Sequence, residues 1–383
     1  MLRRTPLAWL DLLHHRRRFA MSVTGVAFAV FLIFVEVGFL NGVYDSQTDL
    51  VSHFNAELII VNRLKEDVRP LIPFSRGIAI QALAVDGVAD VYPVYADSGR
   101  WKNLDERVSH FALTLGFNPS HPVLDLPELA RHQHDLQLPE TTLFDRESRP
   151  FFGTVKLGQL AEFERKRIVP IATFSLGPDF RTDGMLLMSD TNFLRYFPNP
   201  VSGEIEPDRI EFGLVRLAPG YSAADLRTRL TEALPDDVSV LTKPELMQRV
   251  RGYWKRSKSV GMVFGIGAAV GFTIGVIICY QILFTDISDN FPQYATLSAM
   301  GYSGTFLMKV VLQKALLLSL FGFIPGLLLS GSLYSALQRW TGIRMWMTPD
   351  RVGTVLLMSV GMCVIAGMLA LFKVLKADPA ELY

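Results

Sequence analysis

The chain has 383 residues, of which 50% are hydrophobic and 20% are charged, and its formal net charge is +1 at pH 7. A net charge this close to zero carries no information about nucleic-acid binding, and no nucleic-acid partner is expected. The hydrophobic residues are concentrated in a few long stretches, which excludes an ordinary soluble globular protein.

Four stretches of at least 21 residues contain almost no charged side chain. A helix of about 20 residues crosses a hydrocarbon core that is roughly 30 Å thick. We therefore predict an integral membrane α-helical protein with four transmembrane helices and a large mixed α/β periplasmic domain inserted between helices one and two. The expected segments are a cytoplasmic amphipathic N-terminal helix (1–18), a first span (19–41), the periplasmic α/β domain (42–258), a second span (259–284), a cytoplasmic coupling segment (285–305), a third span (306–338), a short periplasmic loop (339–351), a fourth span (352–372) and a cytoplasmic tail (373–383).

The residues before and within the first span indicate an N-terminal anchor. Residues 5–15 carry Trp9 and several leucines after Pro6, which predicts a short amphipathic helix in the membrane interface. The span that follows is longer than the apolar core of a signal peptide, and no small-x-small cleavage site comes after it. We expect it to stay on the protein, with Glu36 reaching the outer interface; a proton relay is the alternative role for Glu36.

Basic residues indicate the orientation in the membrane. Those that flank the first and last spans are Arg3, Arg4, Arg16, Arg17, Arg18, Lys373 and Lys376. Because positive residues favour the cytoplasmic side, both termini are expected inside. A smaller set beside the other span ends opposes this orientation, namely Lys255, Arg256, Lys258, Arg339, Arg344 and Arg351.

The domain expected at 42–258 alternates between strand-like and helix-like segments, which indicates a mixed α/β fold. The expected strands are Ala56–Val61, Val88–Tyr95, Ser109–Phe117, Arg167–Phe174, Gly184–Met188, Arg209–Leu217 and Val238–Leu241. Helices are expected near Ile78–Ala84, after Asp190 as a cap, and from Ser222 to Pro235. The last of these helices and its flanking strands predict a βαβ unit, whereas residues 118–150 predict an irregular insertion.

No short motif in the chain indicates catalysis. There is no Walker A loop, no HExxH and no CxxC, so we predict a non-catalytic subunit without a cofactor or metal of its own. His121, His132 and His134 lie close in sequence and leave a metal site as the alternative, but residues two apart do not share a helix face. Both cysteines, Cys279 and Cys363, lie in predicted spans, so the large domain is expected to have no disulfide, which is compatible with a bacterial periplasm.

The second and third spans contain packing and bending signals. From Pro244 to Phe284 no further proline occurs, which predicts one nearly continuous helix of about 60 Å. Small residues let helix backbones approach closely in lipid, and the second span has five of them at helical spacing, Gly261, Gly265, Gly267, Gly271 and Gly275. They predict a tight helix–helix face, for which the first span of a second copy is one possible partner. Pro325 predicts a kink in the third span.

The segment 285–305 is expected to face the cytoplasm and to hold a short helix. Asp289 or Asn290 suits its cap, Pro292 its first turn and Gly301 its end. A short capped helix between two spans is suited to docking into a groove on a partner protein.

The stretch DISDNFPQYATLSAMGYS (286–303), followed by GFIPG in the third span, resembles the FtsX/MacB-like permease superfamily and most of all its DevC-type exporter permeases. Shorter passages that begin at Pro6, Gly25, Tyr253 and Gly275 agree with this likeness. The C-terminal Lys376-Ala-Asp378-Pro379-Ala is similar to the basic-x-Asp-Pro-Ala ending of the family. The likeness covers both ends and the whole membrane part, and it is thinner across residues 97–200.

The resemblance implies a permease that forms a homodimer in the bilayer and pairs with a separate ABC ATPase, which would hold ATP and Mg. It places the ATPase-coupling helix at Pro292–Gly301, where Gln293 and Ser298 replace the Glu and the basic residue that the superfamily often has. The residues assigned to the coupling segment on this basis are Asp286, Asp289, Phe291, Pro292, Gln293, Tyr294, Leu297, Met300, Gly301 and Tyr302.

The resemblance also implies a periplasmic adaptor of the membrane-fusion type, an outer-membrane channel and a place in the bacterial inner (cytoplasmic) membrane. We therefore expect a tripartite ABC exporter permease that moves a lipophilic or envelope molecule by mechanotransmission. An FtsX-like signal relay that controls a periplasmic enzyme, or a lipoprotein-release permease, is the alternative.

Overall fold

The computed structural model describes residues 16–69, 71–103, 105–179, 182–199, 202–256, 258–290, 300, 304–341 and 345–376. The chain divides into two compact units. The helical unit comprises residues 1–41, 258–337 and 345–383, and the α/β unit comprises residues 42–257 and 338–344.

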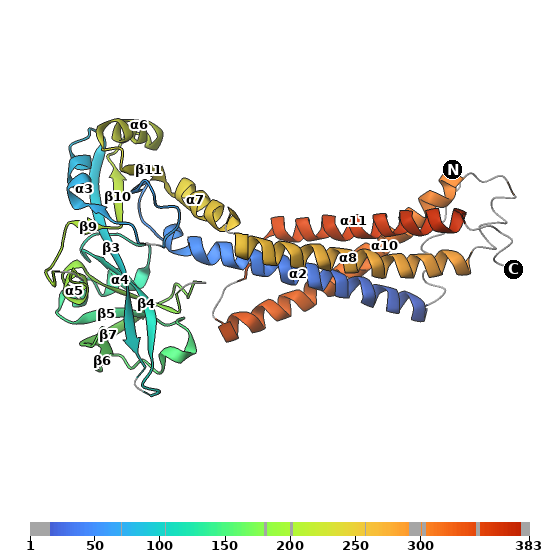
Figure 1. Cartoon of the computed structure of the whole chain (residues 1–383), viewed down its shortest axis with the longest axis horizontal. Helices are drawn as coiled ribbons and strands as arrows, with labels where there is room; N and C mark the ends of the chain where they lie inside the picture. Colours follow the sequence, from blue (N-terminus) through green and yellow to red (C-terminus); the bar gives the residue numbers. More distant parts are fainter. Residues whose placement is uncertain are drawn as a thin grey trace. The chain divides into compact units, whose positions relative to one another are not determined.

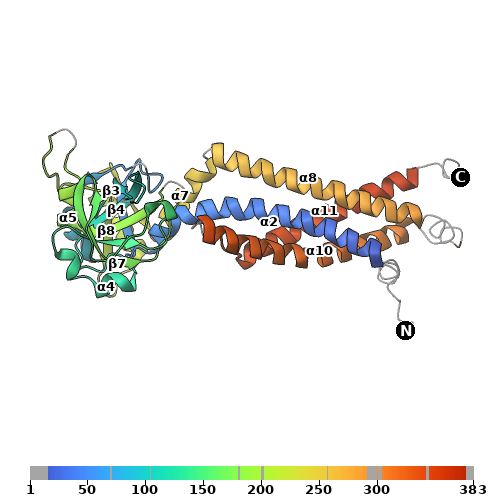
Figure 2. The same ribbon diagram turned by 90° about the horizontal axis from the view of Figure 1, so that it is seen from below.

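Four long helices build the helical unit: α2 (Arg16–Ser52), α8 (Lys258–Asp289), α10 (Gly304–Thr341) and α11 (Pro349–Lys376). Each is long and apolar enough to cross a membrane. They lie side by side in both views (Figures 1 and 2), and their buried side chains form one apolar cluster with members from all four helices, such as Val30, Leu283, Ala315 and Met362.

The helices extend past the span ends expected from hydropathy. Helix α2 continues to Ser52, eleven residues beyond residue 41, and α8 continues to Asp289, five beyond residue 284. The expected ends followed the apolar residues, but backbone hydrogen bonding does not stop where the apolar surface stops. The expected continuous helix from Pro244 to Phe284 is represented by α7 (Lys243–Arg256) and α8, and the residue that joins them, 257, lies outside the described residues.

A nine-stranded sheet forms the frame of the α/β unit, in the order β11-β1-β10-β3-β4-β8-β5-β7-β6, and a separate two-stranded sheet pairs β2 with β9. The strands are β1 (Leu58–Asn62), β2 (Phe74–Ser75), β3 (Val88–Lys102), β4 (Ser109–Phe117), β5 (Thr141–Asp145), β6 (Ala161–Phe163), β7 (Lys166–Phe174), β8 (Gly184–Ser189), β9 (Arg209–Ile210), β10 (Phe212–Leu217) and β11 (Val238–Thr242). The short helices are α3 (Arg76–Leu83), α4 (Pro127–Arg131), α5 (Asp190–Tyr196) and α6 (Ala223–Ala233), with 3-10 turns η1 (Asp135–Gln137) and η2 (Pro150–Phe152).

One strand, β3, belongs to both halves of the α/β unit. Its first part pairs with β10, and its second part pairs with β4 and, at Trp101 and Lys102, with β6. The β6 pairing closes β3-β4-β8-β5-β7-β6 into a barrel. Gly99 permits this closure, because the Phe163 ring of β6 occupies the space that a side chain at 99 would fill.

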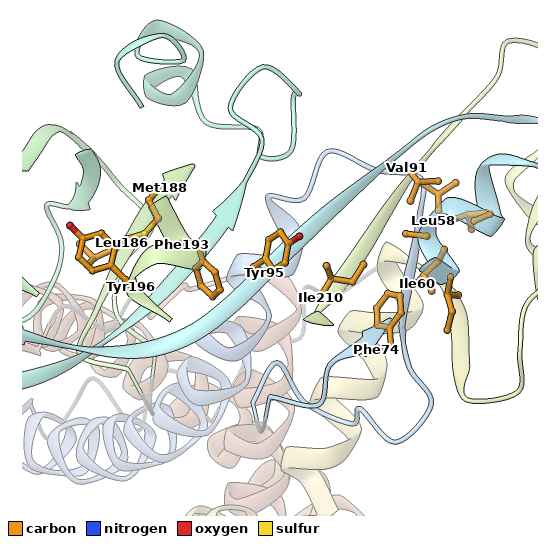
Figure 3. Close-up of a cluster of buried hydrophobic side chains, with 14 of the residues drawn as sticks. Leu58, Ile60, Phe74, Val91, Tyr95, Leu186, Met188, Phe193, Tyr196 and Ile210 are labelled. Carbon is orange, nitrogen blue, oxygen red and sulfur yellow. The ribbon is translucent and has the colours of Figure 1, made fainter. Parts of the chain in front are cut away.

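The apolar core follows β3 from one half to the other. Figure 3 shows Tyr95 on this strand, between a group that includes Met188, Phe193 and Tyr196 and a second group that includes Ile60 and Phe74. Phe193 packs against Tyr95 with ring centroids 5.6 Å apart. The two halves therefore share one continuous buried cluster.

Helix α6 and its neighbouring strands show why the predicted βαβ pattern forms. Ser222 caps α6 by accepting a hydrogen bond from the N–H of Ala224, and Leu226 and Leu230 are buried on one face. Strands β10 and β11 both pair antiparallel with β1, which lies between them, so they run parallel to each other without being neighbours.

Three local expectations in this unit were wrong. Residues 118–150 are not an irregular insertion, because they contain β5, a fully buried strand between β7 and β8. The cap of α5 is Ser189, whose hydroxyl accepts from the N–H of Asn192, and not Asp190. The strand expected at Arg209–Leu217 divides into β9 and β10 at Glu211, whose side chain turns to a buried lysine.

Candidate functional site

The candidate site is the end of the helical unit at which α2 begins, α8 ends and α10 begins. Two acidic residues, Asp286 and Asp289, lie on the last turns of α8. A basic side chain from each of the other three helices lies at this end of α8: Arg18 from α2, Lys314 from α10 and Lys373 from α11. Cations near a helix C-terminus interact favourably with its dipole, so this arrangement stabilises the end of α8.

The contact between α8 and α10 is an ion pair with a buried lysine. The Lys314 Nζ lies 2.6 Å from the Asp286 Oδ2, and the Lys314 side chain is only 1% exposed. Asn290 adds to the contact, because its Nδ2 donates to the Asp286 carbonyl at 3.0 Å. Breaking a buried pair leaves an uncompensated charge, which is strongly destabilising, so this contact holds α8 and α10 in one arrangement.

The contacts from α2 and α11 are more exposed. The Arg18 Nη2 lies 2.5 Å from the Asp289 Oδ2, with both side chains more than 40% exposed. The Lys373 ammonium lies 5.4 Å from the centre of the Phe284 ring, within the range of a cation–π interaction. Together with Lys314 these contacts connect all four helices at the end of α8.

The glycines of α8 show which helix packs on this span. The Cβ positions of Gly271 and Gly275 face α2 of the same chain, near Leu32 and at Ala29 respectively, and Gly275 also meets Met362 of α11. A side chain at Gly267 would collide with the carboxylate of Glu36 on α2. This face is therefore filled from the same chain, by α2 along Gly267–Gly275 and by α11 at Gly275. Gly265 has no atom within 4 Å of its Cβ position, and Gly261 lies in the first turn of α8.

Helix α10 approaches α2 from another side through glycines next to Pro325. An added Cβ at Gly322 would lie 2.4 Å from Val26, and one at Gly326 would lie 2.9 Å from the carbonyl oxygen of Ala27. The helix assignment runs unbroken through Pro325, and the kink at this residue stays a prediction. Helix α2 thus lies in close backbone contact with both α8 and α10.

Most of the predicted coupling residues fall outside the described part of the chain. Asp286 and Asp289 are described above, and Met300 is described as exposed (64%). Lys376 is the last residue of α11. The predicted residues that lie outside the described ranges are Phe291, Pro292, Gln293, Tyr294, Leu297, Gly301, Tyr302, Asp378 and Pro379.

Sequence reasoning missed Arg18 and Lys314 as partners of the two aspartates. A signal was present for Lys314, because it lies inside the expected third span and an ionisable residue in a span is costly unless it is paired. In the described ranges no group of three or more His, Cys, Asp or Glu side chains is placed to hold a metal ion.

Comparison with known proteins finds one family match in the helical unit. Residues 265–379 match the family described as FtsX-like permease C-terminal. The matched region contains most of α8, all of α10 and α11, and the paired residues Asp286 and Lys314. No curated protein matches the chain.

The solved structures to which the chain is similar include three domains, each at low identity. The periplasmic region of MacB from Actinobacillus actinomycetemcomitans aligns with 14% identity and a TM-score of 0.37, over 52% of this chain and 94% of that one. The extracellular domain of the ABC-type transporter YknZ from Gram-positive bacteria aligns with 10% identity and a TM-score of 0.33, over 49% and 100%. A permease-protein domain from Porphyromonas gingivalis aligns with 17% identity and a TM-score of 0.33, over 51% and 97%.

Proposed function

We propose that this chain is the permease subunit of an ABC-type transporter and that a separate ATPase drives it from the end of the helical unit that holds Asp286 and Asp289. The observation that carries the proposal is the FtsX-like permease match over residues 265–379, because it spans the site where charged residues join the helices. The two acidic residues lie immediately before the segment 291–303 in the sequence, which we propose as the docking segment for the ATPase.

The geometry supports a mechanical role for this end of the unit. A force applied to the segment after α8 acts first on the last turns of α8, which are tied to α10 by the Lys314–Asp286 pair and to α2 by the Arg18–Asp289 pair. Helix α2 also packs closely on the glycines of α8 and α10. We propose that movement of the segment is therefore shared by the whole helical unit and is not lost in one helix.

The finer proposal is a DevC-type tripartite exporter in a bacterial inner membrane. In this proposal two copies of the chain act together, the ATPase binds ATP and Mg, and the α/β unit works with a periplasmic adaptor and an outer-membrane channel. The cargo would be a lipophilic or envelope molecule that is collected outside the membrane. Support comes from the sequence resemblance of residues 286–303 and of the chain ends.

The test is ATPase stimulation by purified chain variants. The partner is the ATPase that co-purifies with the full chain, and Tyr294→Asp and Leu297→Asp place a charge on the proposed docking segment. We expect each variant to abolish stimulation while the melting temperature in detergent stays within about 2 °C of wild type, which would show that the variant is still folded. Gly265→Ala, which lies in open space, is the matched control and should stimulate normally.

Unchanged stimulation by both charged variants would refute the docking segment. Co-purification of a cell-wall hydrolase in place of an adaptor and channel would contradict the exporter proposal and leave the ATPase-driven permease in place.

A further inference from the structure

The free edge of the nine-stranded sheet lies in a groove whose lining includes four arginines and two acidic residues. Because β6 closes back on β3, β11 is the edge strand of this sheet in the part of the chain that the structure describes. The cavity beside it has a volume of about 680 Å³ and follows four consecutive residues of the strand, Val238–Leu241. We call this cavity the β11 groove. Figure 1 shows α6 and α7 beside β11, and the remaining lining residues are Arg63, Glu66, Arg227, Thr231, Pro235, Asp236, Arg249 and Arg256.

The hydrogen-bond pattern shows which groups of β11 face the groove. The Arg63 N–H donates to the Asp237 carbonyl at 2.7 Å, which fixes this pair as a hydrogen-bonded pair of the β1–β11 ladder. Such pairs alternate in an antiparallel ladder, so Ser239 and Leu241 also bond to β1, and Val240 turns its N–H and C=O away from β1. The other two outward-facing N–H groups are already used, since Val238 donates to the Pro235 carbonyl at 3.3 Å and Thr242 donates to the Glu245 Oε2 at 2.9 Å. Val240 is therefore the position at which the edge offers both groups to one more strand.

Charges in the groove are only partly neutralised. Arg227 pairs with Glu245, and Arg256 lies 3.2 Å from Glu66. By contrast, Arg63 donates to the Asp236 carbonyl at 3.2 Å, and Arg249 donates to the Lys65 carbonyl at 3.4 Å.

Carbonyl acceptors do not cancel a positive charge, so these two guanidinium groups can still bond to a carboxylate. Burial lowers the pKa of Arg249, against the attraction of Glu66 and Glu245, so this cation is partly desolvated before any partner arrives.

We propose that the β11 groove binds an extended, acidic segment of a partner polypeptide as an added strand on β11. Backbone hydrogen bonds to Val240 supply the binding, as in other cases of strand addition, and carboxylates on the added strand pair with Arg63 and Arg249. The groove follows four residues of β11, which suits a short segment. The proposal goes beyond the ATPase-driven role and does not depend on it.

The test uses the full chain in detergent and a fluorescent peptide of alternating glutamate and valine. We expect saturable binding by fluorescence anisotropy that weakens as salt is raised, and no binding of the matched peptide of alternating lysine and valine. Methylation of alternate backbone nitrogens of the acidic peptide keeps its charge and removes its donors, and it should weaken binding by at least about tenfold. Equal binding of the methylated peptide would mean that the arginines hold an acidic chain or a simple anion without strand addition, which would overturn the proposal.

Variants of the chain test the same point from the protein side. Val240→Pro removes an N–H that β1 does not use, so the edge strand should tolerate it while peptide binding falls by about tenfold. Val240→Ala also shortens the side chain but keeps the N–H, and it should bind as wild type. Arg63→Gln with Arg249→Gln should reduce both the affinity and its salt dependence. Absence of peptide binding to the wild-type chain, or equal binding by the proline and alanine variants, would refute strand addition at β11.

Discussion

Among the residues that the structure describes, each unit contains one lysine that is only about 1% exposed and is paired with a carboxylate, but the two pairs have different surroundings. In the α/β unit the Lys65 Nζ lies 2.5 Å from Glu211, and both side chains are buried. In the helical unit Lys314 pairs with Asp286, which is 18% exposed and lies near the end of its helix. The first pair is enclosed by a core, whereas the second closes one end of a bundle that we expect in lipid.

The two units also bury their helices and strands by different means. The α/β unit packs large apolar side chains such as Phe163, Phe193 and Tyr95 into one cluster. The helical unit brings α2 against α8 and α10 at glycines, where backbones come close. The difference follows from the solvent, since water drives apolar side chains together and lipid does not, so close contact must stabilise helices in a membrane.

The largest expected effect is the loss of the enclosed ion pair. Lys65→Ala leaves Glu211 buried without its cation and should lower the free energy of unfolding by about 3–5 kcal/mol. Burial already lowers the pKa of Lys65 and raises that of Glu211, which shows how costly either charge is alone. Urea unfolding followed by tryptophan fluorescence in detergent measures the change. The double variant Lys65→Met, Glu211→Gln should recover most of the loss, and a single variant as stable as wild type would contradict the role of the pair.

The next effect is a pH dependence that comes from one buried carboxyl group of the α/β unit. Burial raises the pKa of Asp145 from 3.8 to about 6, although the backbone N–H groups of Glu147, Leu176 and Gly177 favour its charged form. The folded state therefore binds this proton more tightly than the unfolded chain does. The contribution of Asp145 to the free energy of unfolding is fully present below pH 3.8. It is lost as the pH rises through 6, which lowers the free energy of unfolding by about 3 kcal/mol.

Asp145→Asn isolates the contribution of this group. The difference in unfolding free energy between wild type and variant should change between pH 4 and pH 7, as measured by urea unfolding at each pH. A difference that stays constant over this range would show that Asp145 titrates normally.

A smaller effect is expected from the glycine contacts of the helical unit. Gly326→Leu would place a side chain against the backbone of α2 at Ala27 and should destabilise the bundle by about 1–3 kcal/mol, because overpacking forces the helices apart. Thermal unfolding in detergent micelles measures it. Gly265→Leu, with open space around it, is the matched control and should change stability by less than about 0.5 kcal/mol. An equal loss of stability in both variants would contradict the claim that Gly326 is packed against α2 and Gly265 is not.

The smallest effect is expected at the exposed pair of the candidate site. Arg18→Gln should cost about 0.2–1 kcal/mol, because both Arg18 and Asp289 are more than 40% exposed and water screens their attraction. Thermal unfolding at low and high salt measures it, and the loss should shrink at high salt. A loss above about 2 kcal/mol would mean that this pair is shielded in the membrane-bound protein.

The sequence predicted those parts of the fold that have a local periodic pattern. The strand at Ser109–Phe117 and the helix that follows Ser222 lie where alternation and capping placed them. Strand β5 was missed because its five residues follow a stretch rich in proline and histidine and its neighbours in the sheet are remote in sequence. The pairing of β6 with β3 that closes the barrel also joins segments far apart in the sequence, so no local pattern predicts it.

The residues of the candidate site likewise include some that the sequence predicted and some that it did not. Asp286 and Asp289 were predicted from a family resemblance, but their partners Arg18 and Lys314 come from other helices and are brought near only by folding. The glycine spacing of α8 indicated a packed face and left its partner open. In the structure Glu36 of α2 occupies the space above Gly267, and Ala29 of α2 and Met362 of α11 occupy the space above Gly275.

The length of β3 has a mechanical consequence for the α/β unit. The fifteen residues of β3 pair with the open sheet at one end and with the barrel at the other. The two parts are therefore joined by a continuous strand and not by a loop. The β10 ladder ends at Val94 and the β4 ladder begins at Tyr95, so resistance to bending at this point comes from the apolar cluster that the two parts share around Tyr95. Any displacement delivered to this unit should therefore be passed on as a rotation or translation of one stiff body.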